Sequence, residues 1–471
     1  MSESTGSSSG FNSYFGFLMA CVGSAIGFGN IWGFPYKMGT HGGAAFLIVY
    51  IILCVFAGFA VMFDEIFLGR RDSKGPFGTY RLVGERSGHK FGFVAWMSFV
   101  SAIALWGFYC TLGGYVLKYC VAYIGDMVGA GFGTSGNAED YFFNFIASGM
   151  PTVVYTILFI LITVGIALGG VSGGVERFCK VGMPLLFLIM LILIIRNSML
   201  PGSGAGWEFI LKPDWNSLTG GHLINTMSSA GGQMFFSLSL GVGGMITYGS
   251  YLNKDNNLKT SAIAVVVFDT LAALMAAFMV FPAVFAFGLE PTSGPSLLFI
   301  TMGTVFDKMS GGAFFGFLFY FLVLVAGLST SLAFAEIVIK DFEELTNKNG
   351  QPMSRNKALI LGTIITIVIN IVVSLDGLGT TGLVQPLGFC WLDFLDLISE
   401  GILMPLGSFF CAIICGWIIG RDKIVEEATI GGEKFTGVGF YMVCTKIIAP
   451  IFMIFVLFGQ IDSFFQLGWF S

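Results

Sequence analysis

Long apolar runs separated by short polar segments make up most of this chain. A helix needs roughly 20 apolar residues to cross about 30 Å of hydrocarbon, so such runs predict membrane-spanning helices. We expect eleven spans, at about residues 12–40, 43–69, 91–125, 151–170, 176–197, 222–253, 258–288, 312–343, 356–375, 392–420 and 436–461. The pattern therefore predicts an all-α polytopic membrane protein packed as one bundle in the lipid bilayer.

Composition agrees with this class. Of the 471 residues, 55% are hydrophobic and 11% are charged, whereas soluble domains are about 25% charged. The 66 glycines suit close packing between membrane helices. The nine cysteines show no CxxC spacing and the three histidines are scattered, so we expect neither a redox site nor a metal centre of these residues. Nothing in the sequence suggests a nucleic-acid partner.

The basic residues predict the orientation. If the N-terminus is cytoplasmic, all but five of the 23 lysines and arginines fall on cytoplasmic segments, as the positive-inside rule requires. The exceptions are Lys37, Lys118, Arg196, Lys212 and Lys308. Eleven spans then place the C-terminus outside the cell (inner) membrane. Residues 1–10 are polar and lack the basic start of a signal peptide, so we expect a disordered tail.

Two of the expected spans contain helix-breaking stretches. The first is "GSAIGFGNIWGFPY" (23–36) and the second is "QMFFSLSLGVGGMITYGSY" (233–251). In hydrocarbon, irregular backbone occurs only where it faces protein, water or a ligand. The glycines could instead serve only close helix contact. The breaks lie in spans one and six, however, and discontinuous helices at equivalent positions of two inverted halves indicate a binding site near the membrane midplane.

We therefore expect two inverted repeats of five helices. The first covers 11–197 (helices 1–5) and the second covers 222–420 (helices 6–10). An external loop at 198–221 joins them, and 421–471 holds helix 11 and the C-terminus.

The broken segments, together with "VAGLSTSLAFAE" (325–336), resemble the neurotransmitter:sodium symporter family, and the length resembles its bacterial members. The resemblance runs from about residue 11 to 460. It implies a LeuT-type 5+5 inverted repeat with helices 1 and 6 broken, and two sodium sites. The first site would use Ala25, Asn30, Ser237 and Asp269. The second would use the carbonyls of Gly23, Ile26 and Ala326 and the hydroxyls of Ser329 and Thr330. Those hydroxyls could instead bond to their own helix.

The resemblance also implies where a substrate would lie. Its carboxylate would meet the amides of Phe28 and Gly29 and the hydroxyl of Tyr109. The other pocket residues would be Ala25, Gly27, Leu105, Phe236, Ser239, Val242, Thr330 and Phe334. Members that carry biogenic amines have an aspartate where Gly27 stands, so glycine implies a substrate with its own carboxylate. The apolar walls imply a neutral hydrophobic or aromatic L-amino acid.

Several further residues have expected roles in support and gating. Glu65, a carboxylate at membrane depth, would hold the unwound backbone of the two broken spans. Gly174 and Pro184 match a motif for unwinding at the start of span five, although an ordinary proline kink is an alternative. Gly33 replaces the usual outer-gate arginine. We therefore expect Lys37 to pair with Asp396, unless Lys37 extends only to the outer interface.

The inner gate departs from the family pattern as well. The arginine and tryptophan of that gate fall at Ser8 and Phe11, so its ion pair is expected to be absent.

The sequence thus predicts a non-enzymatic, Na⁺-coupled importer of an amino acid that works by alternating access, as a monomer or weak homodimer. Asp269 places a fixed carboxylate near the first sodium site, so we expect no need for chloride. The rival hypothesis is an amino-acid sensor on a transporter fold without net flux. A channel would need a continuous polar pore lining, which the sequence does not offer.

Overall fold

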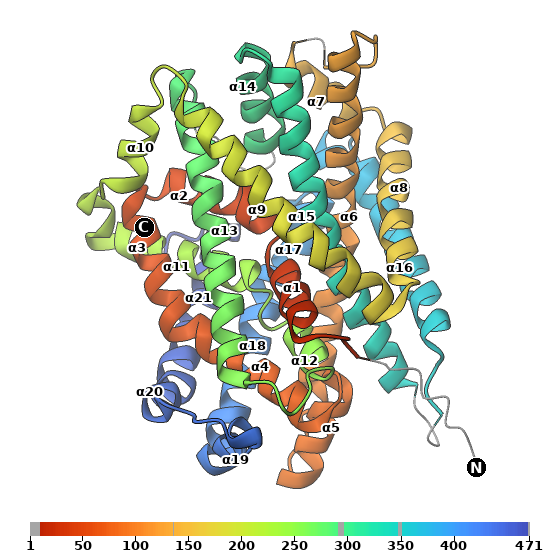
Figure 1. Cartoon of the computed structure of the whole chain (residues 1–471), viewed down its shortest axis with the longest axis vertical. Helices are drawn as coiled ribbons and strands as arrows, with labels where there is room; N and C mark the ends of the chain where they lie inside the picture. Colours follow the sequence, from red (N-terminus) through yellow and green to blue (C-terminus); the bar gives the residue numbers. More distant parts are fainter. Residues whose placement is uncertain (1–9, 135, 291–295, 347–350, 470–471) are drawn as a thin grey trace.

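The computed structural model describes residues 10–134, 136–290, 296–346 and 351–469. Every long element in these ranges is helical, and the helices form one bundle (Figure 1). Within these ranges, nine helices are long and apolar enough to cross a membrane, and a tenth qualifies if one bent pair counts as a single span. The all-α polytopic prediction is confirmed.

Most expected spans correspond to one helix or to two helices in direct continuation. They are α3 (Ala44–Leu53) with α4 (Phe59–Asp72), α6 (Gly92–Val128), α8 (Met150–Ala167), α9 (Arg177–Ser198), α13 (Leu258–Ala286), α15 (Gly312–Leu345), α16 (Arg355–Asp376), α17 (Trp391–Asp396) with α18 (Met404–Ile413), and α20 (Val438–Val443) with α21 (Ala449–Phe465). π-Helical turns join α3 to α4, α17 to α18 and α20 to α21. Such turns are frequent at functional sites.

The two remaining spans are broken. In the first, α1 (Tyr14–Ala25) is followed by a π-helical turn at Gly29–Gly33 and by α2 (Phe34–Thr40), with a bend of 51°. In the sixth, α11 (Gly220–Ser237) is followed by α12 (Gly244–Gly249). The expected span 222–253 does not qualify by length and hydropathy, because α11 carries many polar residues and α12 has only 6 residues.

Short helices lie at both ends of the bundle (Figure 1). α5 (Pro76–Ser87) and α19 (Arg421–Ala428) lie at one end. α7 (Ala138–Ile146), α10 (Gly204–Leu211) and α14 (Met302–Lys308) lie at the other. The positive-inside pattern predicts that the first end is cytoplasmic, so we call the second the outer end.

Helix α15 lies in the centre of the bundle, where it packs against α1, α6, α8, α9 and α16. Glycines permit this close packing. A β-carbon at Gly316 would lie 2.3 Å from the Tyr123 ring of α6, and one at Gly327 would lie 2.6 Å from the Phe28 ring. Membrane helices associate through such small-residue contacts because lipid supplies no hydrophobic drive between them. The packing fixes α15 beside the break in span one.

Candidate functional site

The break after α1 frees backbone oxygens inside the bundle. The amide of Gly27 would bond to the carbonyl of Gly23 in a continuous helix, but it donates to Asn30 Oδ1 at 3.2 Å instead. The carbonyls of Gly23 and Ile26 accept the Thr330 hydroxyl, at 3.2 and 3.3 Å. The break therefore turns two main-chain oxygens toward α15, where they can meet a cation.

The second break depends on left-handed backbone. Gly241 and Gly243 both have φ of 82°, and Ser239 has φ of 52°. A β-carbon on Gly241 would lie 2.2 Å from the carbonyl oxygen of Met404. Glycine at 241 is thus required both by its conformation and by the close approach of α18.

Two hydrogen bonds hold the broken segments in place. The Gly241 amide donates to Glu65 Oε1 at 2.6 Å. The Ser239 hydroxyl donates to the Ser24 carbonyl at 3.1 Å, which links the sixth span to the first. Glu65 is buried on α4. It thus contacts the unwound backbone of span six, in the position that a supporting carboxylate would occupy.

A buried polar cluster lies where the first sodium site was expected. Asn30 Nδ2 donates to Asp269 Oδ1 at 2.8 Å, and the Ser237 hydroxyl lies 2.9 and 3.0 Å from the two carboxylate oxygens. The Tyr50 hydroxyl, which sequence reasoning did not include, donates to Asp269 Oδ2 at 3.2 Å. Ala25 lies on the wall of the adjacent central cavity. The cluster offers hard oxygen atoms and one negative charge.

The second expected sodium site lies between α1 and α15. The Thr330 hydroxyl reaches across to Gly23 and Ile26, whereas the Ser329 hydroxyl donates to the Ala326 carbonyl of its own helix at 2.8 Å. The alternative of bonding within the helix thus holds for Ser329 only. Across residues 10–469, apart from the undescribed positions, no group of three or more His, Cys, Asp or Glu could hold a metal ion. The oxygens here are neutral, which suits Na⁺ rather than a transition metal.

A small central cavity of about 10 Å³ lies between the two breaks. Its lining consists of Ala25, Gly27, Gly29, Leu105, Tyr109, Phe236, Ser239, Thr330, Phe334 and Met404. Such a volume holds about one water molecule. A larger ligand would therefore require Phe236 or its neighbours to move. Among the described residues, this lining contains no charged side chain.

The lining of the central cavity differs from the expected pocket at two positions. Val242 is buried but does not line the cavity, because left-handed Gly241 and Gly243 turn the chain on both sides of it. Met404, at the start of α18, supplies that wall instead. Phe28 lies outside the central cavity and stacks on Tyr109, with ring centroids 4.4 Å apart. Nothing in the sequence indicated that Met404, rather than another residue of span ten, would line the cavity.

Gly27 faces two hydroxyl groups. A β-carbon there would lie 2.4 Å from the Tyr109 hydroxyl and 2.6 Å from the Thr330 hydroxyl. The Tyr109 hydroxyl also accepts the amide of Phe28 at 3.0 Å. This position has no room for a side chain, and an aspartate could not be accommodated without displacing Tyr109.

A second cavity, of about 680 Å³, extends from the central site toward the outer end. Phe236, Tyr109 and Gly29 line both cavities. The expected Lys37–Asp396 ion pair is wrong in its partner, because Lys37 Nζ lies 2.8 Å from Glu400 Oε1. Asp396 lines the same cavity, one helical turn before Glu400. The spacing of four residues on one helix face was the signal that could have pointed to Glu400.

Gln233 fills the space beside Gly33. Its Nε2 donates to the Gly29 carbonyl at 2.8 Å, and its Oε1 would lie 3.1 Å from a β-carbon at Gly33. Gln233 thus occupies part of the volume that an arginine side chain from position 33 would need.

The opposite side of the site is packed. Phe11 lies edge-on to Tyr248 and Tyr251, with centroids 5.8 and 6.1 Å apart. The Glu176 carboxylate accepts the Asn12 amide at 2.7 Å and the Ser13 hydroxyl at 3.0 Å, which ties the start of the chain to span five. Ser8 lies outside the described residues. The site is therefore open toward the outer end, through the larger cavity, and packed on the opposite side.

Span five is helical from its start. Gly174 lies in a π-helical turn at Val171–Glu176, and Pro184 lies inside α9. A β-carbon at Gly174 would lie 2.1 Å from the Ile166 carbonyl oxygen. Unwinding between Gly174 and Pro184 stays a prediction.

The bundle with two broken spans and buried oxygen clusters at the breaks defines a secondary transporter rather than an enzyme. The model of the Sodium:neurotransmitter symporter family matches residues 9–128 and 144–470. The chain belongs to this family.

Known proteins with similar sequences or structures support this family assignment. A Haemophilus influenzae protein named "Uncharacterized sodium-dependent transporter" is 31% identical, over 94% of this chain and 96% of its own. The Bacillus subtilis "Uncharacterized sodium-dependent transporter YhdH" is 31% identical, over 95% and 96%. The crystal structure of MhsT in complex with L-phenylalanine matches with a TM-score of 0.86 and 31% identity, over 96% of this chain and 99% of MhsT.

Proposed function

We propose that the chain imports a neutral apolar or aromatic L-amino acid together with Na⁺, by alternating access and without chloride. The observation that carries the proposal is the contact around Gly27, where the hydroxyls of Tyr109 and Thr330 leave no space for a side-chain carboxylate. The amine of a substrate would therefore find no side-chain carboxylate at position 27 to pair with. We infer that the substrate brings its own carboxylate. The uncharged lining of the central cavity favours an apolar side chain.

The similarity to MhsT, whose structure holds L-phenylalanine, supports an amino acid of this kind. The substrate carboxylate would bind at the amides of Phe28 and Gly29 and the Tyr109 hydroxyl. Since Tyr109 accepts the Phe28 amide at 3.0 Å, the substrate would take over that hydrogen bond.

Na⁺ is a co-substrate in this proposal. One ion would bind at Asn30, Ser237, Asp269 and the carbonyl of Ala25. The other would bind at the Thr330 and Ser329 hydroxyls and the carbonyls of Gly23, Ile26 and Ala326. Both clusters include residues beside the breaks, so Na⁺ binding would order the same backbone that holds the substrate. The scaffold would then rock to open the inner face, and unwinding between Gly174 and Pro184 would release the ion.

Uptake into proteoliposomes tests the proposal. With an inward Na⁺ gradient, the protein should accumulate labelled L-phenylalanine or another apolar amino acid, and should not accumulate lysine, glutamate or a monoamine. Preloaded vesicles should also exchange labelled for unlabelled substrate. Binding without any exchange would contradict transport and would favour the sensor hypothesis.

A further inference from the structure

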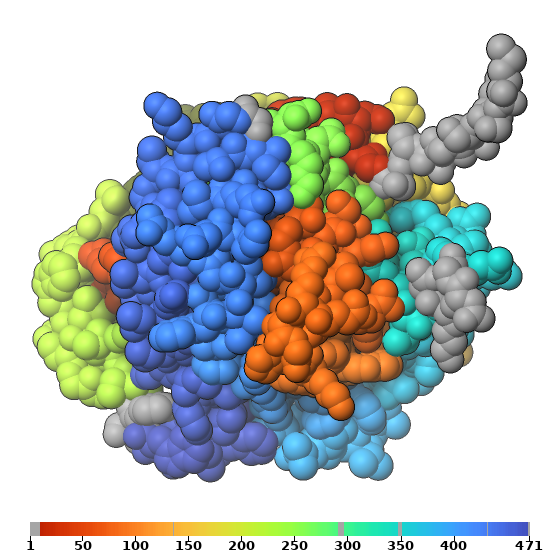
Figure 2. Space-filling view, turned by 90° about the horizontal axis from the view of Figure 1, so that it is seen from below, coloured from red at the N-terminus to blue at the C-terminus, as the bar shows by residue number. Residues whose placement is uncertain are grey.

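Another pocket lies away from these two cavities, between α5 and α19. Figure 2 shows this face, with α5 in orange beside the blue C-terminal segment that contains α19. The pocket measures about 520 Å³. Its polar side is formed by three cations and two carboxylates, Arg71, Arg86, Lys423, Glu426 and Glu427, and its apolar side by Val83, Ile418 and Ile419. A cavity whose polar wall has more cations than carboxylates, and whose other wall is apolar, matches a ligand that has an anionic head and a hydrocarbon tail.

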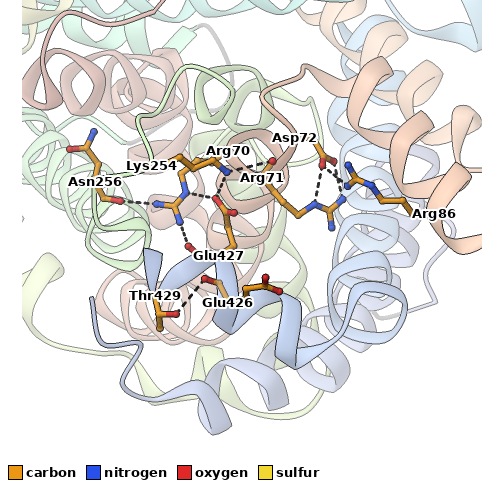
Figure 3. A network of polar contacts seen from close by, with 9 residues as sticks. All are labelled: Arg70, Arg71, Asp72, Arg86, Lys254, Asn256, Glu426, Glu427 and Thr429. Carbon is orange, nitrogen blue, oxygen red and sulfur yellow. Dashed lines mark hydrogen bonds and ion pairs between the residues drawn. The ribbon is translucent and has the colours of Figure 1, made fainter. Parts of the chain in front are cut away.

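The ion pairs around this pocket leave positive charge in excess (Figure 3). Asp72 is shared by Arg71 and Arg86, at 2.8 and 2.6 Å. Glu427 is shared by Arg70 and Lys254, at 2.9 and 2.7 Å.

Lys423 pairs with Glu426 at 2.8 Å. Five cations thus face three carboxylates in this network. Arg71, Arg86 and Lys423 line the pocket together with Glu426 and Glu427, so the lining has one cation in excess, and positive charge favours an anion there.

The cationic ends are also accessible. The side chains of Arg86 and Lys423 are 55% and 68% exposed, so a ligand can reach both without unfolding. Arg71 is held more tightly, with its guanidinium over the Phe67 ring at 5.6 Å.

Aromatic residues place the pocket at the membrane surface. Trp417 directly precedes Ile418 and is 60% exposed, with its indole nitrogen donating to the Lys446 carbonyl at 3.1 Å. Trp96 of α6 is 48% exposed and packs against Phe77 of α5. Exposed tryptophans of membrane proteins gather at the level of the lipid headgroups. The pocket thus lies where phospholipid phosphates are found.

We propose that this pocket binds the headgroup of an anionic phospholipid from the leaflet on the α5–α19 side. The phosphate would lie between Arg86 and Lys423, and the acyl chains would pass along Ile418 and Ile419. Basic pockets between membrane helices bind lipid headgroups in this way. The lipid would join α5 to α19 through its phosphate.

Lipid binding by the purified protein tests the proposal. The protein in an uncharged detergent is titrated with phosphatidylglycerol or with phosphatidylcholine, and bound lipid is counted by native mass spectrometry. Phosphatidylglycerol should bind more tightly. The double variant Arg86→Gln/Lys423→Gln should lose this preference, by about fivefold in apparent affinity for each cation removed. The matched control is Lys212→Gln/Lys308→Gln, which removes the same charge at the outer end and should bind like the wild type.

Three results would overturn the proposal: equal binding of the two lipids, an unchanged preference in Arg86→Gln/Lys423→Gln, or an equal loss in both double variants. Inorganic phosphate provides a further arm. If phosphate alone displaces phosphatidylglycerol at matched concentration, the pocket is a soluble-anion site rather than a lipid site. Should Arg86→Gln/Lys423→Gln unfold at a lower temperature than the wild type without lipid, Arg86→Lys/Lys423→Arg keeps the charge and must retain the preference.

Discussion

The ammonium of Lys37 lies 2.8 Å from the carboxylate of Glu400, and both side chains line the outer cavity. The pair joins the end of the first span to the π-helical turn Leu397–Leu403 of span ten. The two side chains are only 20% and 9% exposed, so solvent screens this pair less than a surface ion pair. We predict that this contact closes the outer cavity over a bound substrate.

Breaking this pair should impair transport. Lys37→Ala leaves Glu400 and the neighbouring Asp396 without a cation, which is costly for partly buried carboxylates. We expect severalfold lower Na⁺-driven uptake for Lys37→Ala, and similarly for Glu400→Ala. The reversed pair Lys37→Glu/Glu400→Lys should recover part of the activity.

The exposed pair Lys212–Glu208, at 3.0 Å, is the control for the gate. Reversing it should leave uptake unchanged. Normal uptake by Lys37→Ala would show that the pair has no gating role. If Lys37→Glu regained uptake when combined with Asp396→Lys but not with Glu400→Lys, the functional partner of Lys37 would be Asp396, as the sequence predicted.

A methyl group at position 27 should block substrate binding. Gly27→Ala brings a β-carbon within 2.4 Å of the Tyr109 hydroxyl, so Tyr109 must leave the position where we propose that it meets the substrate carboxylate. We expect apparent affinity to fall about tenfold or more, as for other overpacked sites. Scintillation proximity binding of labelled L-phenylalanine measures this. Gly165→Ala, on α8 with open space around its β-carbon, is the matched control. Equal binding by both variants would contradict the geometry.

Met404 should set the size of the accepted side chain. Met404→Ala enlarges the central cavity, so larger substrates such as tryptophan should gain relative to leucine. A change of about tenfold in the ratio of kcat/KM values is expected from the volume of a few methylene groups. Competition uptake with the two amino acids provides the measurement. Met127→Ala, which alters an exposed methionine, should keep the wild-type ratio. An unchanged ratio in Met404→Ala would remove Met404 from the specificity wall.

Asp269 should be required for sodium coupling. Asp269→Asn removes the only formal charge among Asn30, Ser237, Tyr50 and Asp269, and disturbs the three donors that meet it. The Na⁺ concentration for half-maximal binding should rise at least about tenfold. Asp214→Asn, on an outer loop, is the control. A wild-type Na⁺ response in Asp269→Asn would show that the negative charge of Asp269 is not needed for Na⁺ binding.

The same carboxylate accounts for the expected independence from chloride. Replacing chloride with gluconate should leave Na⁺-driven uptake of the wild-type protein within error. A large loss in gluconate would show that Asp269 does not balance the charge at the first sodium site.

The sequence by itself determined the class of the protein and the position of its breaks. Apolar runs of span length leave little choice but helices, because no other open structure satisfies its backbone in lipid. Gly241 and Gly243 indicated where span six had to unwind, and the motifs around Gly23 and Thr330 identified residues that indeed lie together. The breaks are local features, so the spacing of residues along the chain was enough to predict them, whereas the meeting of Gly23 with Thr330 was implied by the resemblance to the symporter family.

The tertiary structure alone decided which side chains meet across helices. Lys37 pairs with Glu400 rather than Asp396, although both carboxylates line the outer cavity one helical turn apart. Met404 replaces Val242 in the central wall because the turn at Gly241 packs against α18. Such choices depend on the relative rotation of helices far apart in sequence. A rotation by one residue moves a side chain about 100° around the helix axis, which the hydrophobic pattern of a fully buried helix does not fix.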